Sequence, residues 1–307
     1  MTAEPSDAWL RAYAARLSRG VRDGSPVRRV HTPSGALVVH VGDVVVKVHH
    51  LRTDAAALSR RLAASGQLAA RGLVVPPLSS RPVTDPASGR LVTAWPRVDV
   101  LGPDDGDLPW AAAGELLARL HRTPVDAVTA RLGAHGGGDR VDRALARVAD
   151  LGIGDDVRHL LSTVGAPLAA QLAAQLVAQR RDGAQPGDSR RGSLVHGDWH
   201  LGQLAHDGDG WRLLDIDDVG LGDPAWDLGR PAGFWAAGLL DDEDWGTFID
   251  AYRAAGGPGI PHDSDPWPRL DLPARCAVFV AAVRELAIQP ASSEISASAL
   301  LQACARM

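Results

Sequence analysis

Three oxygen-bearing side chains within residues 193–230 have the types and the spacing that phosphate chemistry requires. Asp198 and Gln203 flank a short loop, and Asp215 follows the next apolar run, residues 211–214. Carboxylate and amide oxygens can hold Mg²⁺ against nucleotide phosphates, and a carboxylate can also orient an attacking hydroxyl. The sequence therefore predicts a metal–phosphate site in this stretch.

Two short strands and a turn must position these side chains. The apolar pair 194–195 indicates a strand that enters the loop, and residues 211–214 indicate another strand. The run DGDG at 207–210 has the Asp-Gly composition of a hairpin turn. Such a hairpin is expected to bring the three side chains together although they span eighteen positions.

Other interpretations of the same stretch are weaker. His196 and His200 have the spacing of a helical zinc pair, but Gly197 and the apolar flanks disfavour a helix, and no Glu follows the first His. Residues 220–225 match a dinucleotide fingerprint, yet Asp223 stands where a pyrophosphate would lie and no βαβ unit follows. A third interpretation is a solvated acidic loop, but it would not explain why an acid follows the end of each of the two apolar runs, Asp198 after 194–195 and Asp215 after 211–214.

The runs HGDWHLGQ (196–203), LDID (214–217) and GDPAWDL (222–228) together resemble the signature of the aminoglycoside phosphotransferase and choline-kinase-like superfamily of small-molecule kinases. The spacing Asp-x-x-x-x-Gln also resembles the Asp-x-x-x-x-Asn of a protein-kinase catalytic loop. Gln203 departs from the family, most of which has Asn. Bacterial maltokinases have a similar His-Leu-Gly-Gln run, so this departure does not exclude activity.

The resemblance implies a role for each of these residues. Asp198 is expected to be the catalytic base, and Gln203 and Asp215 are expected to be the Mg²⁺ ligands. Asp223 and Asp227 are expected at the start of a helix behind the site.

The N-terminal third predicts a small sheet. A helix is expected from Asp7, as its cap, to about Leu17, and a further helical segment covers 54–70. Five strands rich in β-branched residues are expected at 27–30, 36–41, 44–48, 73–78 and 90–96.

Lys47 is the first nucleotide-binding candidate. It is a lone cation in the strand 44–48, where it needs a solvated edge or an anion, and in the kinase arrangement this lysine reaches the ATP phosphates. Protein kinases pair this lysine with a Glu of the next helix. Asp54 is the one carboxylate between residues 48 and 84, so it is a candidate partner, and it is equally explicable as a helix N-cap.

Two further segments are candidates for nucleotide contacts. The turn 31–35 offers backbone N–H groups and the hydroxyls of Thr32 and Ser34, with Gly35 closing it. Trp95 and Arg97 stand where a kinase-like fold has its hinge, and backbone groups there would bind adenine.

The remaining chain is mostly helical, with segments at 110–121, 141–149, 156–179, 273–289 and 293–305. Asp217, Asp218 and His200 are candidates for acceptor contacts. The acidic run 241–244 indicates a helix cap, or a second group of acids that faces the acceptor.

These features predict an α+β fold of the bilobal protein-kinase-like type. Residues 1–98 would form the N-lobe, with an antiparallel sheet that binds ATP, and 99–307 a mostly helical C-lobe with the catalytic loop, the Mg²⁺ site and the acceptor site. Too few residues separate Asp215 from Gly222 for an activation loop, which favours a small-molecule hydroxyl acceptor over a protein.

An aminoglycoside or amino sugar is the leading acceptor, on the nearby acids and on resemblance. A sugar kinase of the maltose or glucosamine type, or a choline or homoserine kinase, is the alternative. A nucleotide-binding pseudokinase is a rival of another class, although Lys47, Asp198, Gln203 and Asp215 are all present.

Composition narrows the class of protein further. The 307 residues are 45% apolar, enough for a substantial core, and the net charge of -5 gives no overall field that favours nucleic acid. Cys276 and Cys304 fit neither a disulfide framework nor a metal knuckle and are expected to be reduced. No secretory leader and no run of eighteen apolar residues is evident, so a cytoplasmic enzyme with no membrane partner is expected.

Overall fold

The computed structural model describes residues 4–32, 35–102, 106–181, 192–289 and 298–307. The chain forms two compact units. The N-terminal unit comprises residues 1–104 and 202–217, and the C-terminal unit comprises residues 105–201 and 218–307. Residues 202–217 thus pack with the N-terminal unit, and the domain boundary expected after residue 98 stays a prediction.

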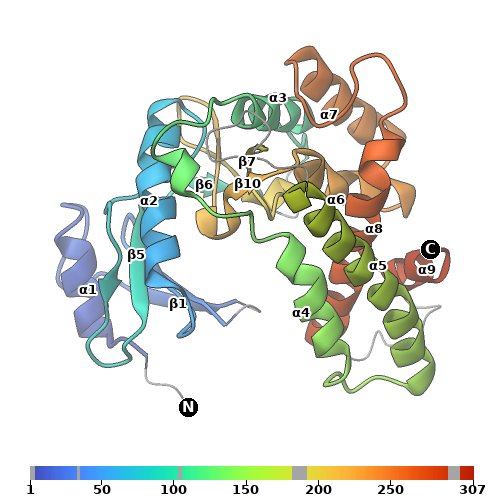
Figure 1. The fold of residues 1–307 in the computed structure, drawn as a ribbon. Coiled ribbons are helices and arrows are strands. Elements are labelled where there is room, and N and C mark those ends of the chain that lie inside the picture. Colours follow the sequence, from blue (N-terminus) through green and yellow to red (C-terminus); the bar gives the residue numbers. More distant parts are fainter. Residues whose placement is uncertain (1–3, 33–34, 103–105, 182–191, 290–297) are drawn as a thin grey trace. The chain divides into compact units, whose positions relative to one another are not determined.

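A five-stranded antiparallel sheet forms the N-terminal unit, in the order β1-β2-β3-β5-β4 (Figure 1). Its strands are β1 (Val27–His31), β2 (Leu37–Val41), β3 (Val44–Val48), β4 (Val83–Thr84) and β5 (Leu91–Pro96). The predicted number of strands is confirmed, but the strand expected at 73–78 is wrong. Pro76 and Pro77 have no N–H to donate to a ladder. That segment makes a bridge at Val74 to Leu213 and a backbone hydrogen bond from Leu78 to the Ala94 carbonyl of β5, and β4 takes the fifth place in the sheet.

Burial alternates along the two central strands and gives the sheet two faces. Val44, Val46 and Val48 are buried in a core that includes Leu10 and Tyr13 of α1 (Asp7–Ala15). The intervening positions of β3 face the other side of the sheet, because successive side chains of a strand point in opposite directions. Helix α1 begins one residue earlier than predicted, since Ser6 rather than Asp7 caps it and accepts from the backbone N–H of Trp9 at 3.2 Å.

The predicted Asp-Gly turn at 207–210 forms a hairpin, but its first strand is not the apolar pair 194–195 that was expected. Strand β8 (Leu204–His206) pairs with β9 (Trp211–Leu213) and also with β6 (Asp99–Val100). Asp207 shapes the turn, because its side chain accepts hydrogen bonds from the backbone N–H groups of Asp209 and Gly210, each at 3.1 Å. The strand before the loop, β7 (Ser193–Val195), pairs instead with β10 (Gly220–Gly222) in the C-terminal unit.

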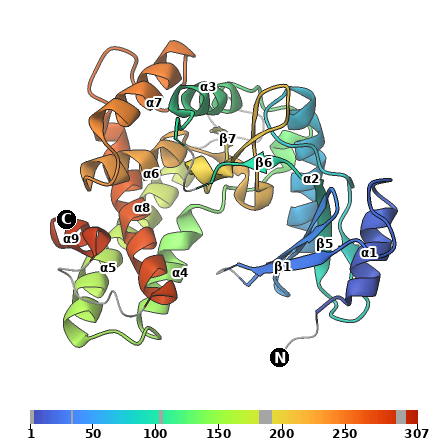
Figure 2. The same cartoon turned by 180° about the vertical axis from the view of Figure 1, so that it is seen from behind.

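Helices dominate the C-terminal unit (Figure 2). They are α3 (Trp110–His121), α4 (Gly138–Val148), α5 (Asp155–Arg181), α6 (Ala225–Ala236), α7 (Asp242–Ala254), α8 (Trp267–Ile288) and α9 (Ala299–Ala305). Helix α8 packs against α6 and α4, and its Phe279 is fully buried in their common core. Asp241 caps α7, so the acidic run has the helix-cap role.

The remaining elements are short. Helix α2 (Ala55–Ala70) belongs to the N-terminal unit, and three single-turn 3₁₀ helices lie at Thr129–Arg131, Leu201–Gln203 and Ile216–Asp218. Part of the helix predicted at 293–305 lies outside the described residues, and α9 accounts for the rest. Within the described chain no helix has the length and apolar character needed to span a membrane.

Candidate active site

Lys47 lies at the centre of a charge cluster in the N-terminal unit. Its Nζ lies 2.7 Å from Asp215 Oδ1 and 2.9 Å from Asp217 Oδ2, and its side chain is only 14% exposed. Burial alone would lower the pKa of Lys47, but the two carboxylates outweigh it and raise that pKa above its ordinary value. The ammonium is therefore charged throughout the physiological range.

Lys47 is also the only lysine in the sequence; every other member of the 32 Lys and Arg residues is arginine. An ammonium is a compact point charge, whereas a guanidinium is a planar fork. The single exception to this use of arginine thus falls at the position where a compact cation meets two carboxylates.

Asp217 makes a second contact, to the buried histidine His49, which directly follows β3. Its Oδ2 lies 3.5 Å from His49 Nδ1, and His49 Nε2 lies 2.8 Å from the Thr93 hydroxyl. Burial raises the pKa of Asp217, but Lys47 and His49 outweigh it, so this pKa lies below its ordinary value. Asp217, a predicted acceptor contact, is paired with Lys47, and its contact with the acceptor stays a prediction.

The hairpin positions Asp215 through an unusual backbone conformation. Its φ is 51°, the one positive value among the described non-glycine residues, in the left-handed region that costs most residues about 1 kcal/mol or more. The backbone N–H of Leu214 donates to the Gln203 carbonyl at 2.8 Å and ties the two ends of the hairpin together. The bend lets Asp215 and Asp217, two residues apart, both face Lys47.

A cavity of about 640 Å³ adjoins this cluster, wholly within the N-terminal unit. This volume is in the range of small-ligand sites in proteins. Its lining combines Lys47, Asp215, Asp217 and Gln203 with apolar side chains of the sheet face opposite α1, and it includes the predicted hinge residues Trp95 and Arg97.

The other predicted nucleotide residues have local partners. The Thr32 hydroxyl donates to the Ala36 carbonyl at 2.9 Å, and Gly35 has a φ of 80° that suits a glycine in this turn. Ser34 lies outside the described residues. Asp54 caps α2 and accepts from the N–H groups of Ala56 and Ala57, so of its two predicted roles the structure shows the cap, and the acidic partners of Lys47 are Asp215 and Asp217.

The donor atoms at this cavity suit a hard cation. Asp215 offers a carboxylate and Gln203 an amide oxygen, both of which line the cavity. Mg²⁺ commonly binds through one or two protein oxygens plus substrate phosphates. Among the described residues no group of three His, Cys, Asp or Glu side chains forms a metal site. The two oxygen ligands therefore suit a metal ion that binds together with the nucleotide phosphates.

Asp198 lies in the C-terminal unit, where Arg140 of α4 holds it. The Arg140 guanidinium forms ion pairs with both Asp198 and Asp218. Burial would lower the pKa of Arg140, but the two carboxylates raise it above its ordinary value. Asp218, a predicted acceptor contact, therefore already has a cationic partner.

Buried Asp227 supports the loop that carries Asp198. Its carboxylate accepts hydrogen bonds from the backbone N–H groups of His196 at 2.6 Å and Gly197 at 2.8 Å, and it lies 3.0 Å from His121 Nε2. His121 Nδ1 lies 2.8 Å from the Tyr252 hydroxyl. Burial raises the pKa of Asp227, but these donors outweigh it and lower that pKa, so the carboxylate is ionised. The predicted place of Asp227 behind the site stays a prediction, and these hydrogen bonds are the observation that supports it.

Gly197 is required by close approach as well as by its φ of 84°. A Cβ at this position would lie 2.5 Å from the Asp218 carbonyl oxygen, closer than two such atoms can approach. This glycine therefore lets the chain turn tightly between β7 and Asp198.

A small pocket of about 70 Å³ lies beside Asp198 in the C-terminal unit. Three arginines line it, Arg140, Arg230 and Arg284, together with Trp199 and Trp226. None of these arginines was predicted from the sequence, because Arg140 and Arg284 belong to helices far from the motif, and Arg230, just after it, follows no pattern of its own.

His200, a predicted acceptor contact, lies in surroundings that disfavour its charged form. Burial lowers its pKa to about 3, with further lowering by the charges of Arg230 and Arg284. Its imidazole is therefore neutral at physiological pH. The convergence of Asp198 with Gln203 and Asp215 stays a prediction, since the structure places Asp198 in one compact unit and the other two in the second.

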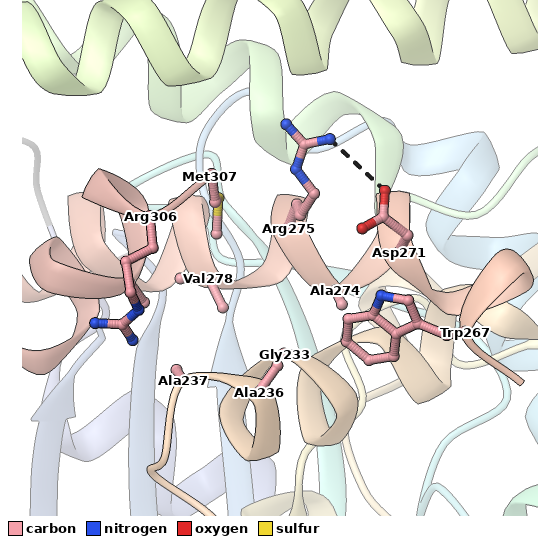
Figure 3. Close-up of a pocket in the computed structure, with 11 residues that line it drawn as sticks. Gly233, Ala236, Ala237, Trp267, Asp271, Ala274, Arg275, Val278, Arg306 and Met307 are labelled. Atoms are coloured by element: carbon pink, nitrogen blue, oxygen red, sulfur yellow. Dashed lines mark ion pairs between the residues drawn. The ribbon is translucent and has the colours of Figure 1, made fainter.

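A third hollow, of about 300 Å³, lies between α6, α8 and the C-terminus (Figure 3). Asp271 and Arg275 of α8, which both line it, form an ion pair at 3.6 Å. None of the predicted site residues lines it, so we do not assign it to the active site.

A lysine held by two acids at a ligand-sized cavity, on the third strand of an antiparallel sheet, is the arrangement that the kinase-like prediction requires. The model of the phosphotransferase enzyme family matches residues 8–272, and the chain belongs to that family. The predicted superfamily and fold class are thereby confirmed. No curated protein sequence matches the chain significantly.

Solved structures share the fold over most of the chain. An amicoumacin kinase, hAmiN, in complex with AMP-PNP and Ca²⁺ has a TM-score of 0.61 at 15% identity, covering 98% of this chain and 92% of its own. A choline/ethanolamine kinase family protein from Mesorhizobium loti has a TM-score of 0.56 at 17% identity, covering 97% and 98%. The aminoglycoside phosphotransferase APH(3'')-Id from Streptomyces rimosus has a TM-score of 0.55 at 20% identity, covering 88% and 98%. At these identities the likeness concerns the fold.

Proposed function

We propose that this protein transfers the γ-phosphoryl group of ATP to a hydroxyl of a small molecule in the cytoplasm. One observation carries the proposal: the only lysine of the chain lies at a cavity of about 640 Å³, between two carboxylates. A nucleoside triphosphate suits this cavity, because its phosphates would meet the lysine and its flat base would lie against the apolar part of the lining. The similar fold of a kinase solved with AMP-PNP and a divalent ion supports this choice of ligand.

Lys47 would bind the ATP phosphates and offset the charge that spreads over them during transfer. Asp215 and Gln203 would hold Mg²⁺, which, when bound, neutralises phosphate charge. Asp217 remains ionised beside Lys47 and keeps the ammonium in place. The turn at Thr32 and Gly35 and the hinge at Trp95 and Arg97 are retained as proposed nucleotide contacts.

Asp198 would orient the acceptor hydroxyl and accept its proton. Arg140 fixes this carboxylate by an ion pair, and Asp227 fixes its loop through two backbone N–H groups. A carboxylate held from two sides is preorganised, which is how positioning contributes to catalysis.

The acceptor is proposed to be a small molecule, because only six residues separate Asp215 from Gly222. The aminoglycoside or amino-sugar prediction depended on Asp217 and Asp218 as partners of ammonium groups. Each of these acids has a cationic partner within its own unit, Lys47 and Arg140 respectively. The acceptor class therefore depends on the other side chains beside Asp198.

The single lysine provides a sharp test of the nucleotide site. Reductive methylation with ¹³C-formaldehyde labels only amines, so Lys47 and the chain's α-amino group give the two expected NMR signals. MgATP should shift the Lys47 signal and leave the α-amino signal unchanged. An unchanged Lys47 signal at saturating MgATP would refute its assignment as the phosphate-binding group.

Transfer is tested separately by Asp198→Asn. ADP formation should lose its dependence on the acceptor, while MgATP affinity stays nearly that of the parent protein. If transfer survives, Asp198 is not the base. If the parent protein binds MgATP but no acceptor in a panel of aminoglycosides, hexosamines, maltose, choline and hydroxy acids accelerates ADP formation, the chain is a nucleotide-binding module.

A further inference from the structure

The pocket beside Asp198 carries more positive charge than its acids balance. Arg230 comes from α6 and Arg284 from α8, and both line the pocket together with Asp198. Asp198 is the only acid in that lining, and it is already ion-paired with Arg140.

Neither of these two arginines has an acidic partner among the described residues. Arg230 instead stacks over the Phe234 ring, with its guanidinium carbon 5.3 Å from the ring centroid. Burial and the charges of Arg284 and Arg140 lower the pKa of Arg230, although Asp198 opposes this. The one carboxylate near Arg230 is that of Asp198, which is already ion-paired with Arg140. The three guanidiniums of the pocket therefore repel one another with too little negative charge between them, and an entering anion would lower that cost.

The same arginines also act on His200 of the loop. After burial, the largest contributions that lower its pKa come from Arg230, His196, Arg284 and Arg140, all of them basic side chains. The surroundings of the loop thus disfavour an additional positive charge.

A cationic acceptor does not suit these surroundings. An ammonium would add a like charge to the arginines, and the acids near Asp198 already have partners. A guanidinium fork matches the oxygen pairs of a carboxylate or a phosphate, to which it can donate two parallel hydrogen bonds.

On the basis of the proposed kinase function, we propose that the acceptor is an anionic alcohol, which carries a carboxylate or phosphate that Arg230 and Arg284 bind. The hydroxyl oxygen of this alcohol forms a bond to the γ-phosphorus of ATP. The bond from that phosphorus to the β-phosphate oxygen breaks, ADP leaves with the electron pair, and the hydroxyl proton passes to Asp198.

Four three-carbon alcohols that differ in charge test this proposal. D-glycerate carries a carboxylate, glycerol 3-phosphate a phosphate, glycerol no charge, and 3-amino-1,2-propanediol an ammonium. Their affinities are measured by calorimetry at constant ionic strength in the presence of MgADP. We expect at least one anion to bind about tenfold more tightly than glycerol, the effect of one charge-assisted contact, and the ammonium to bind most weakly. The better of the two anions identifies the acidic group.

The matched variants are Arg284→Gln and Arg275→Gln. Both positions lie on α8, but Arg275 lines the separate hollow of Figure 3. Arg284 is exposed, so its replacement leaves the core unchanged. The anion's advantage over glycerol should largely disappear in Arg284→Gln and persist in Arg275→Gln.

Three results would overturn the proposal: neither anion binds more tightly than glycerol, the ammonium compound binds best, or both variants lose the advantage equally. MgATP affinity is measured on the same samples. A protein that binds the anions but shows no Lys47-dependent MgATP binding would instead refute the proposed kinase function.

Discussion

Protonation of His200 should make the stability of this protein fall as the pH drops from 7 to 5. His200 is largely buried in the C-terminal unit, and burial together with nearby cations lowers its pKa to about 3, from an ordinary value of about 6.5. The folded protein therefore keeps the imidazole neutral at a pH where the unfolded chain protonates it.

The sign and size follow from proton linkage. Between these two pKa values the unfolded chain binds more protons than the folded protein. The free energy of unfolding therefore rises with pH in this window, and it decreases as the pH falls below about 6.5. With a folded-state pKa of about 3, this single group costs about 2 kcal/mol of stability between pH 7 and pH 5. Above pH 7 it contributes almost nothing further.

The assay compares urea unfolding of the parent protein and His200→Asn at pH 7 and pH 5. The parent should lose about 2 kcal/mol more than the variant between the two pH values. His159→Asn replaces an exposed histidine of the same unit and should leave the parent's pH dependence unchanged. An identical loss in the parent and His200→Asn would show that His200 is not held neutral, and the argument for a positive field beside it would fail too.

Three other substitutions separate the roles assigned above. Lys47→Arg keeps the positive charge but not its compact shape, and should reduce acceptor-dependent ADP formation by at least about tenfold with little change in the thermal midpoint. Asp227→Asn leaves three donors facing an amide, and should lower the free energy of unfolding by about 3 kcal/mol in a urea titration. Asp54→Ala removes a helix cap, so it should lower the thermal midpoint and leave MgATP affinity unchanged; weaker MgATP binding would restore Asp54 as a partner of Lys47.

Local sequence patterns were sufficient for the central strands and for the turn of the hairpin, but not for its first strand. The alternation in β2 and β3 comes from one buried and one open face, and the Asp-Gly turn at 207–210 has few alternatives to a hairpin. The segment 73–78 failed because its apolar run satisfied strand composition, while Pro76 and Pro77 withheld the donors that pairing needs. The cap of α1 failed for a smaller reason: Ser6 and Asp7 are both good caps, and only backbone geometry decides between them.

The partners of the predicted site residues could not be read from the sequence. Arg140 lies 58 positions before Asp198, in a helix whose composition resembles that of any amphipathic surface helix. A chain with this many arginines offers no local signal for the one that binds a particular carboxylate. Asp217 and Asp218 were both expected at the acceptor because relatives that bind amino sugars use acids for ammonium groups, yet the chain pairs one with Lys47 and the other with Arg140.

That divergence gives the two units different electrostatic preferences. In the N-terminal unit the Lys47 ammonium is shared by Asp215 and Asp217, and this local group of three carries one excess negative charge that suits a divalent cation accompanying a nucleotide. In the C-terminal unit one guanidinium is shared by two carboxylates in the same way, but Arg230 and Arg284 reverse the balance. A phosphotransferase whose acceptor side is positive has no electrostatic reason to bind a polyamine. Its selectivity should therefore depend on the acidic group of the acceptor, in addition to the hydroxyl that receives the phosphate.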